Sequence, residues 1–390
     1  MKNKILFRLD DFIVEEKVSL PSLEAGPYTV YSIKKRGWNT VDAVRQLSQA
    51  WMINAADCAF GGKKDRHGET VQYITIKGGP AQCLELKNIL VEFKGYTNRP
   101  MGSDAIEGNL FMTVVRNLTP EEASEALENA QGVAATGFVN YFDDQRFGGH
   151  DLSRGFLAEW LLKGHLNSAL RAYLASSHPD DKKEEKERKA FLNAHWKDWQ
   201  ACLGVAKTSF EKRVFARLVN DPKGLHRLIE EIPSQDFHMS ASVYQSFLWN
   251  EIVRRLLVTR KWASRFYKGM AGDYVFFEKI NGRDYEYLKN MTLHHPADKV
   301  QMPDKILGKI YEKILAEREV QVALFGKLKT AKVFFKPTPR RVLVKPQETV
   351  FRVEDDEQNT DRKKIVLEFF LPRGSYATMF LKRIFASPLI

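Results

Sequence analysis

Cysteine is scarce in this chain, and its scarcity excludes several kinds of fold and site. Only Cys58, Cys83 and Cys202 occur among 390 residues. They are odd in number, far apart and form no C-x-x-C pair, so the sequence indicates neither a disulfide framework nor a zinc knuckle. This usage is typical of a protein from a reducing compartment.

Long apolar runs are also missing. No stretch approaches the roughly 18 apolar residues that a membrane-spanning helix needs. The first segment, "MKNKILFRLDDF", reaches a pair of carboxylates before the apolar core of a signal peptide could form. We therefore expect a cytoplasmic protein with no membrane segment.

The usual nucleotide-binding signatures are incomplete in the loop "FGGKKDRHGETVQYITI", residues 60–76. A P-loop needs G-x-x-x-x-G-K-[ST], and here the lysines lead to Asp65 instead of a hydroxyl. A dinucleotide turn needs G-x-G-x-x-G before a helix, and only Gly61-Gly62 is present, followed by a strand pattern. Zinc-deaminase motifs and clusters of metal-binding carboxylates are absent as well, so no cofactor and no metal are expected.

What the loop does contain is a glycine turn that displays one aspartate. Asp65 stands between Lys64 and Arg66. Neighbouring cations favour the ionised form of a carboxylate, which a nucleophile or a base requires. The alternative is structural, with Asp65 and Arg66 closing a turn.

Charge and length point to a large protein with an anionic partner. The chain carries 60 Lys+Arg against 49 Asp+Glu, a formal charge of +11. Such an excess favours a polyanion such as nucleic acid, although a merely basic protein would show it too. Since single cores stop growing near roughly 250–300 residues, we expect two folded units.

The order of patterns predicts an α+β fold. Alternating segments at 28–33, 71–76 and 110–115 predict strands, and Thr119 with Glu122 forms a capping box that opens a helix. Residues from about 152 to 258 are helical in pattern. Strand-like runs return in 331–390, so we expect the last segment to complete the first sheet around a helical insertion.

Seven segments in order resemble motifs of the TruD family of tRNA pseudouridine synthases. "GGKKDRHGETVQ" is similar to the family's active-site motif A-G-x-K-D-x-x-A-x-T-x-Q. The other six are "DFIVEE" (11–16), "KRGWNT" (35–40), "EGNLFMTVVR" (107–116), "NYFDDQRFGG" (140–149), "SASVYQSFLWN" (240–250) and "LPRGSYATMFLKRI" (371–384). The resemblance therefore covers nearly the whole chain.

The resemblance implies a fold, a reaction and a partner. The fold is a catalytic domain with a mixed or antiparallel sheet, residues 1–164 and 326–390, interrupted by a mainly helical insertion domain, residues 165–325. The reaction breaks the C1′–N1 bond of a uridine in tRNA and rejoins the base through C5, without a cofactor. The implied site is position 13 of the D-arm, as in tRNA-Glu. We expect a monomer.

The same motifs supply candidate site residues. Asp65 would be the catalytic carboxylate, and its reaction could be addition to C1′, addition to C6 or removal of a proton at C2′. The motifs also supply candidates for substrate binding. Phe142 would stack on the base or pack in the core, and Asn140 would hydrogen-bond to the ligand. Lys64, Lys35 and Arg146 would contact phosphates, steer Asp65 or be solvated surface residues. Glu16 would be a site anchor or half of an ion pair.

Two positions depart from the family pattern. Gly68 stands where the family usually has Ala, and Asp143 replaces the glycine that follows N-Y-F. We expect the turn at Asp143 either to adopt another conformation or to tolerate a residue other than glycine. In "SASVYQSFLWN" we expect a mostly structural helix, capped by Ser242.

Overall fold

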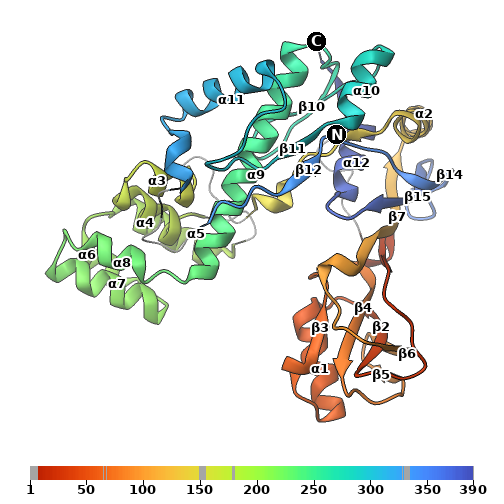
Figure 1. The fold of residues 1–390 in the computed structure, drawn as a ribbon, viewed down its shortest axis with the longest axis horizontal. Coiled ribbons are helices and arrows are strands. Elements are labelled where there is room, and N and C mark those ends of the chain that lie inside the picture. The colour runs from red at the N-terminus through yellow and green to blue at the C-terminus, as the bar shows by residue number, and fades with distance from the viewer. Residues whose placement is uncertain are drawn as a thin grey trace. The chain divides into compact units, whose positions relative to one another are not determined.

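The computed structural model describes residues 8–64, 66, 68–148, 155–177, 181–326, 328 and 334–389. The chain divides into two compact units (Figure 1). We call Met1–Phe138 with Val344–Phe385 the sheet unit, and Val139–Leu343 with Ala386–Ile390 the helical unit. These limits describe compactness, and the domain limits predicted from the resemblance, 165 and 325, stay a prediction.

The sheet unit is built on one mixed sheet, which confirms the predicted α+β class. Among the described residues, β1 and β4 pair in parallel and the other strand pairs of this sheet are antiparallel. In sheet order the strands are β14 (Gln347–Asp355), β15 (Lys363–Pro372), β7 (Ile106–Leu118), β1 (Phe12–Val18), β4 (Glu69–Lys77), β2 (Tyr28–Arg36), β6 (Ile89–Thr97) and β5 (Leu84–Leu86), with β3 (Cys58–Phe60) paired to β4.

One end of this sheet is covered by helix α1 (Thr40–Trp51). Asn39 caps the helix by accepting a hydrogen bond from the Asp42 amide, and Met52 ends it in the left-handed conformation. The apolar face of α1 packs on β2, β4 and β6. The fully buried cluster that results comprises Tyr31, Ile33, Ala43, Leu47, Ile74, Ile76, Ile89 and Val91.

The C-terminal strands complete the sheet, as predicted. β15 pairs with β7 from Lys363↔Leu118 to Pro372↔Gly108. Helix α2 (Pro120–Thr136) begins at the predicted capping box of Thr119 and Glu122. Phe369 of β15 then stacks 5.5 Å from Phe111, between ring centroids. The remaining elements of this unit are α12 (Ala377–Ile384) and the 3-10 turns η1 (Leu9–Asp11), η2 (Ala55–Asp57) and η3 (Ser103–Ala105).

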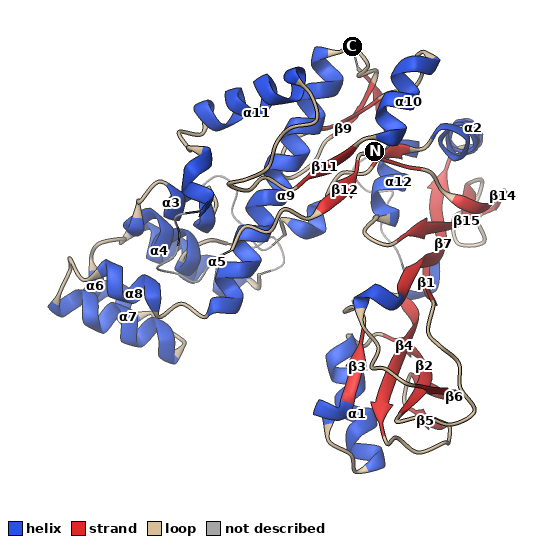
Figure 2. Cartoon of the chain, in the orientation of Figure 1, coloured by secondary structure: helices blue, strands red, loops and turns tan. Residues whose placement is uncertain are grey.

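The helical unit is mostly helix in its described part (Figure 2). Its longest helix, α9 (Ser234–Thr259), is buried along most of its length. The other helices are α3 (Leu157–Leu162), α4 (Leu166–Leu174), α5 (Lys183–Ala194), α6 (Trp199–Gly204), α7 (Ser209–Asn220), α8 (Leu225–Glu230), α10 (Gly282–Asn290) and α11 (Lys305–Glu317), with η4 (Asp144–Arg146) and η6 (Val322–Gly326).

Short strands complete this unit. β9 (Arg265–Tyr267) pairs with β10 (Tyr274–Phe276) and with β16 (Ser387–Pro388), while β11 (Thr292–His294) pairs with β12 (Pro339–Arg341). β8 (Phe138–Val139) and β13 (Leu343–Val344) span the points where the chain passes from one unit to the other.

Two expectations about local structure are corrected. Helix α9 begins at Ser234, so Ser242 lies two turns inside it and caps nothing. The helical pattern after residue 156 is confirmed as two helices, α3 and α4, and Gly164 adopts a positive φ of 74° between them. The expected strand at 331–336 is not found in its described residues, 334–336.

No helix among the described residues is both long enough and apolar enough to span a bilayer.

Candidate active site

Asp65, the expected catalytic carboxylate, lies outside the described residues, as does His67. Its neighbours Lys64, Arg66 and Gly68 are described. The structure therefore shows how the chain is held on both sides of Asp65.

The backbone of Lys64 is docked onto the start of α1. The Lys64 amide donates to Oγ1 of Thr40 at 2.8 Å, and the Lys64 carbonyl accepts from the Thr40 amide at 3.3 Å. Thr40 Oγ1 also donates to Oε1 of Gln72 in β4, at 2.7 Å. Because the partners Thr40 and Gln72 belong to a helix and a strand, the residue before Asp65 has a fixed position.

Lys35 strengthens the same contact. Its side chain is 1% exposed, and its ammonium donates to the carbonyls of Trp38 at 2.7 Å and Lys64 at 3.3 Å. The predicted alternative of a solvated surface residue is therefore wrong for Lys35. Steering of Asp65 and a phosphate contact both stay predictions.

The side chain of Lys64 turns inward toward a buried carboxylate. Its Nζ lies 3.2 Å from Oε1 of Glu16, without hydrogen-bond geometry, and donates to Oδ1 of Asn109. Oε2 of Glu16 accepts from the Tyr73 amide at 3.0 Å. Side-chain exposure is 17% for Lys64 and 0% for Glu16, so Glu16 is half of a buried ion pair.

Removal of the Lys64 charge should therefore destabilise the protein. Lys64→Met leaves the Glu16 carboxylate buried with a single backbone donor, and we expect a loss of about 2–4 kcal/mol in the free energy of unfolding. The measurement is chemical denaturation. Adding Glu16→Gln to the Lys64→Met variant should recover part of the loss, since no unpaired charge is then buried. A Lys64→Met variant as stable as wild type would show that the pair contributes nothing.

Gly68 explains one departure from the family pattern. Its φ is +152°, and a Cβ at this position would lie 2.5 Å from the carbonyl oxygen of Phe12. Both the backbone conformation and the space therefore favour glycine here, where the family usually has Ala.

We expect Gly68→Ala to lower stability by about 1–3 kcal/mol and to slow the reaction, because the exit of the Asp65 loop must shift. Gly62→Ala is the matched control, since its Cβ would meet nothing closer than Ile106 Cδ1 at 3.9 Å. Thermal melting of the two variants compares them directly. Equal melting temperatures would contradict the steric account.

The remaining candidates lie in the helical unit, and Asn140 is tied to β12. The carbonyl and Oδ1 of Asn140 accept from Arg340 at 2.8 and 3.0 Å, while its Nδ2 donates to the Arg341 carbonyl at 3.2 Å. Asn140 is 4% exposed. These contacts fix both the backbone and the amide of Asn140.

Phe142 is buried in its own unit, with 6% exposure. The Arg340 guanidinium lies 3.9 Å from the ring centroid, and the rings of Trp249 and His295 meet it edge to face at 5.7 and 5.2 Å. The backbone amide and carbonyl of Phe142 bind the side-chain amide of Asn250, at 2.9 and 2.8 Å. The ring is packed as a core residue is, and base stacking stays a prediction.

Arg146, in η4, is hydrogen-bonded to two serines of helix α9. Its Nε donates to Oγ of Ser246 at 3.3 Å, and its Nη2 donates to Oγ of Ser242. Ser242 thus positions the guanidinium of Arg146. Asp143 needs no glycine conformation, since its φ and ψ are −79° and 165°.

The structure thus gathers the described candidates into two groups. Glu16, Lys35 and Lys64 meet in the sheet unit, and Asn140, Phe142 and Arg146 follow one another in the helical unit. Sequence reasoning missed their partners Thr40, Asn109, Asn250 and Arg340. The first three lie inside the motifs quoted above, and that position could have identified them as candidates. Arg340 lies in none of these motifs.

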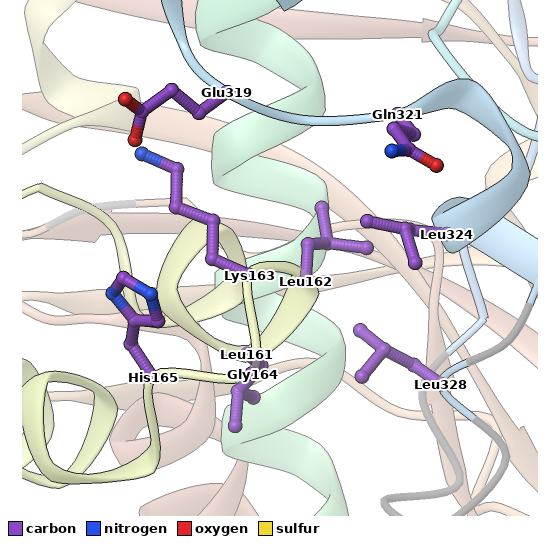
Figure 3. Close-up of a pocket in the computed structure, with 9 residues that line it drawn as sticks. All are labelled: Leu161, Leu162, Lys163, Gly164, His165, Glu319, Gln321, Leu324 and Leu328. Atoms are coloured by element: carbon purple, nitrogen blue, oxygen red, sulfur yellow. The ribbon is translucent and has the colours of Figure 1, made fainter.

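Of two hollows in the described surface, only one is lined by a predicted site residue. One of about 330 Å³ borders Lys35, beside β2 and the β5–β6 turn. A larger one, of about 560 Å³, lies in the helical unit, where Lys163 points toward Glu319 (Figure 3). No predicted site residue lines the larger hollow. The described residues contain no group of three His, Cys, Asp or Glu side chains placed to bind a metal ion.

The mixed sheet, with its buried Lys64–Glu16 pair beside a glycine loop, and a helix-rich second unit define an α+β protein of two units. Comparison with known proteins adds the family. The family model for tRNA pseudouridine synthase D (TruD) matches residues 2–384. The chain belongs to the TruD family of tRNA pseudouridine synthases.

Individual relatives agree along the whole length. A protein of Methanococcus maripaludis is 30% identical over 387 residues, which cover 96% of this chain and 97% of that protein. The tRNA pseudouridine synthase D of Leptospira interrogans is 28% identical over 394 residues, which cover 96% and 94%. A crystal structure from Methanosarcina mazei, assigned as tRNA pseudouridine synthase D, shares the fold with a TM-score of 0.76 and 24% identity, covering 97% of this chain and 92% of that one.

Proposed function

We propose that the protein converts one uridine of a tRNA to pseudouridine, at position 13 of the D-arm as in tRNA-Glu, with Asp65 as the catalytic carboxylate and no cofactor. The observation that carries this proposal is the fixed position of Lys64. Its backbone bonds to Thr40 and Lys35, and its side chain pairs with Glu16. A reacting group gains most from a rigid neighbour, because orientation is then established before the substrate binds.

The reaction is an isomerisation, so atoms and electrons balance without a second substrate. The C1′–N1 bond breaks, the base turns, and a C1′–C5 bond forms. The proton on C5 leaves to solvent and N1 takes one up. A carboxylate can assist by adding to C1′, by adding to C6, or by removing the C2′ proton, and all three routes use the ionised form of Asp65.

The two lysines of the sheet unit would have two roles in the reaction. Lys35 and Lys64 hold the loop in place, and the positive charges of Lys64 and Arg66, which flank Asp65 in the sequence, favour its ionised state at neutral pH. Glu16 offsets the charge of Lys64, so the loop is not surrounded by unbalanced positive charge. We therefore propose Lys35, Lys64 and Glu16 as positioning residues.

In the helical unit we propose that Phe142 stacks on the target base, that Asn140 bonds to it, and that Arg146 contacts RNA phosphate. These roles are supported by hydrogen bonds that hold the residues in place. Asn250 holds the Phe142 backbone and two serines of α9 orient Arg146. The net charge of +11 suits a polyanionic substrate. We also propose a monomer in the cytoplasm, with residues 165–325 as an insertion domain.

Tritium release tests the proposal. Transcribed tRNA-Glu that carries tritium at C5 of uridine is incubated with the purified protein in EDTA. We expect one equivalent of tritium from the reacting uridine to appear in water, because C5 loses its hydrogen when the new bond forms. No release in EDTA, with release restored by a metal ion or by a nucleotide cofactor, would refute the cofactor-free mechanism.

A further inference from the structure

His295 contacts the ring that we propose as the stacking platform. It follows β11, and its backbone amide donates to the Thr338 carbonyl at 3.0 Å. Its imidazole meets Phe142 edge to face, with ring centroids 5.2 Å apart and an interplanar angle of 66°. The side chain is half-buried.

No described group uses the hydrogen-bonding capacity of this imidazole. Within the described part of the chain, no group donates to or accepts from either ring nitrogen of His295. Its polar neighbours are bonded. Arg340 donates to Asn140 and to the Tyr141 carbonyl, and Arg146 donates to two serines. A half-buried polar group without a partner suits a ligand that supplies the bond.

The imidazole is also neutral at physiological pH. Burial, together with the smaller effects of the charges of Arg340, Arg146 and His294, lowers the pKa of His295 to about 4. A neutral imidazole offers one donor and one acceptor, whereas an imidazolium offers only donors. Because the two ring nitrogens point away from each other, His295 can offer a ligand edge either its donor or its acceptor.

The backbone around His295 is held by α9. Nε1 of Trp249 donates to the Leu293 carbonyl at 3.2 Å, and Nε2 of Gln245 donates to the carbonyls of Pro296 at 2.8 Å and Lys336 at 3.0 Å. These bonds anchor the chain on both sides of His295. The buried polar residues of α9 thus do more than pack, because they orient His295 as well as Phe142.

We propose that His295 is a base-recognition residue, whose imidazole bonds to the polar edge of the uracil ring that Phe142 stacks on. This inference rests on the proposed function. The uracil edge presents N3–H between two carbonyl oxygens, and one ring nitrogen of the neutral imidazole can bond to this edge, either as acceptor from N3–H or as donor to a carbonyl oxygen. Removing such a partner leaves the polar edge of the base unmatched and weakens its orientation more than the binding of the whole RNA.

The test compares His295→Phe with His294→Phe, an exposed neighbour that also loses one imidazole. We expect His295→Phe to slow single-turnover pseudouridine formation by about 10–100-fold, with tRNA affinity within threefold of wild type, and His294→Phe to react normally. His295→Gln, which keeps a donor and an acceptor, should recover part of the rate and serves if the phenylalanine variant folds poorly. Normal rates in both His295 variants would overturn the inference.

Wild type in the same assay separates the two levels of the account. If wild type forms no pseudouridine, the proposed function fails; if wild type and His295→Phe react equally, only the role of His295 fails. The pH dependence of stability tests the protonation state of His295 without an activity assay. Because the folded-state pKa is lowered below the usual 6.5, the stability of wild type relative to His295→Phe should fall as pH is lowered from about 6.5 toward 4. A constant difference would overturn the neutral imidazole.

Discussion

Asp65→Asn is expected to reduce pseudouridine formation by at least about 1,000-fold while leaving the fold and tRNA binding nearly intact. The substitution is nearly isosteric, so it removes the negative charge and basicity of the side chain and little else. The bonds that hold Lys64 to Thr40 and Lys35 do not depend on the residue that follows. The loss should therefore appear in the rate of the chemical step.

The measurement is the single-turnover rate with saturating enzyme, beside thermal melting and tRNA affinity. Asp57→Asn, in the exposed turn η2 of the same unit, is the matched control and should react at the wild-type rate. An Asp65→Asn rate within tenfold of wild type would remove Asp65 from the chemistry, whatever the family pattern implies.

Phe142 is expected to show the second-largest effect, on two properties at once. Phe142→Ala removes a ring that is 6% exposed and in contact with Arg340, Trp249 and His295, so stability should fall by about 3–5 kcal/mol. If the ring also stacks on the base, the single-turnover rate per folded molecule should fall by a further 5–150-fold, which corresponds to about 1–3 kcal/mol.

Separating the two effects needs a milder change and a control. Phe142→Leu keeps apolar volume and loses the aromatic face. Phe215→Leu, in a fully buried site on α7, should cost similar stability without slowing the reaction. Rates measured at low temperature, where both variants are folded, decide the question. Equal per-molecule rates would leave Phe142 a core residue only.

Local patterns in the sequence predicted local structure well. The capping box of Thr119 and Glu122 depends on contacts three residues apart, so it could be identified without the fold. The strands at 28–33, 71–76 and 110–115 also alternate clearly enough to be recognised. The start of α9 was missed because Ser242 has the side chain of a helix cap, although tertiary packing extends the helix two turns further back.

The sequence could predict which residues belong to the candidate site, but it could not predict which of them are in contact. The motifs pointed to Lys35, Lys64 and Glu16, but only the mixed sheet brings them together, through strands that are distant in sequence. Burial was not predictable for the same reason. Phe142 and Lys35 look like surface ligands in a motif, whereas their environment is set by α9 in one case and by the start of α1 in the other.

The central claim is that this chain makes pseudouridine at one tRNA position through Asp65. The most direct test is nucleotide-resolution mapping of pseudouridine in transcribed tRNA-Glu after incubation with wild type or with Asp65→Asn, in EDTA. The account predicts a new pseudouridine at position 13 with wild type and none with the variant. Modification of equal extent by both proteins, or no pseudouridine in the tRNA treated with wild type, would contradict it.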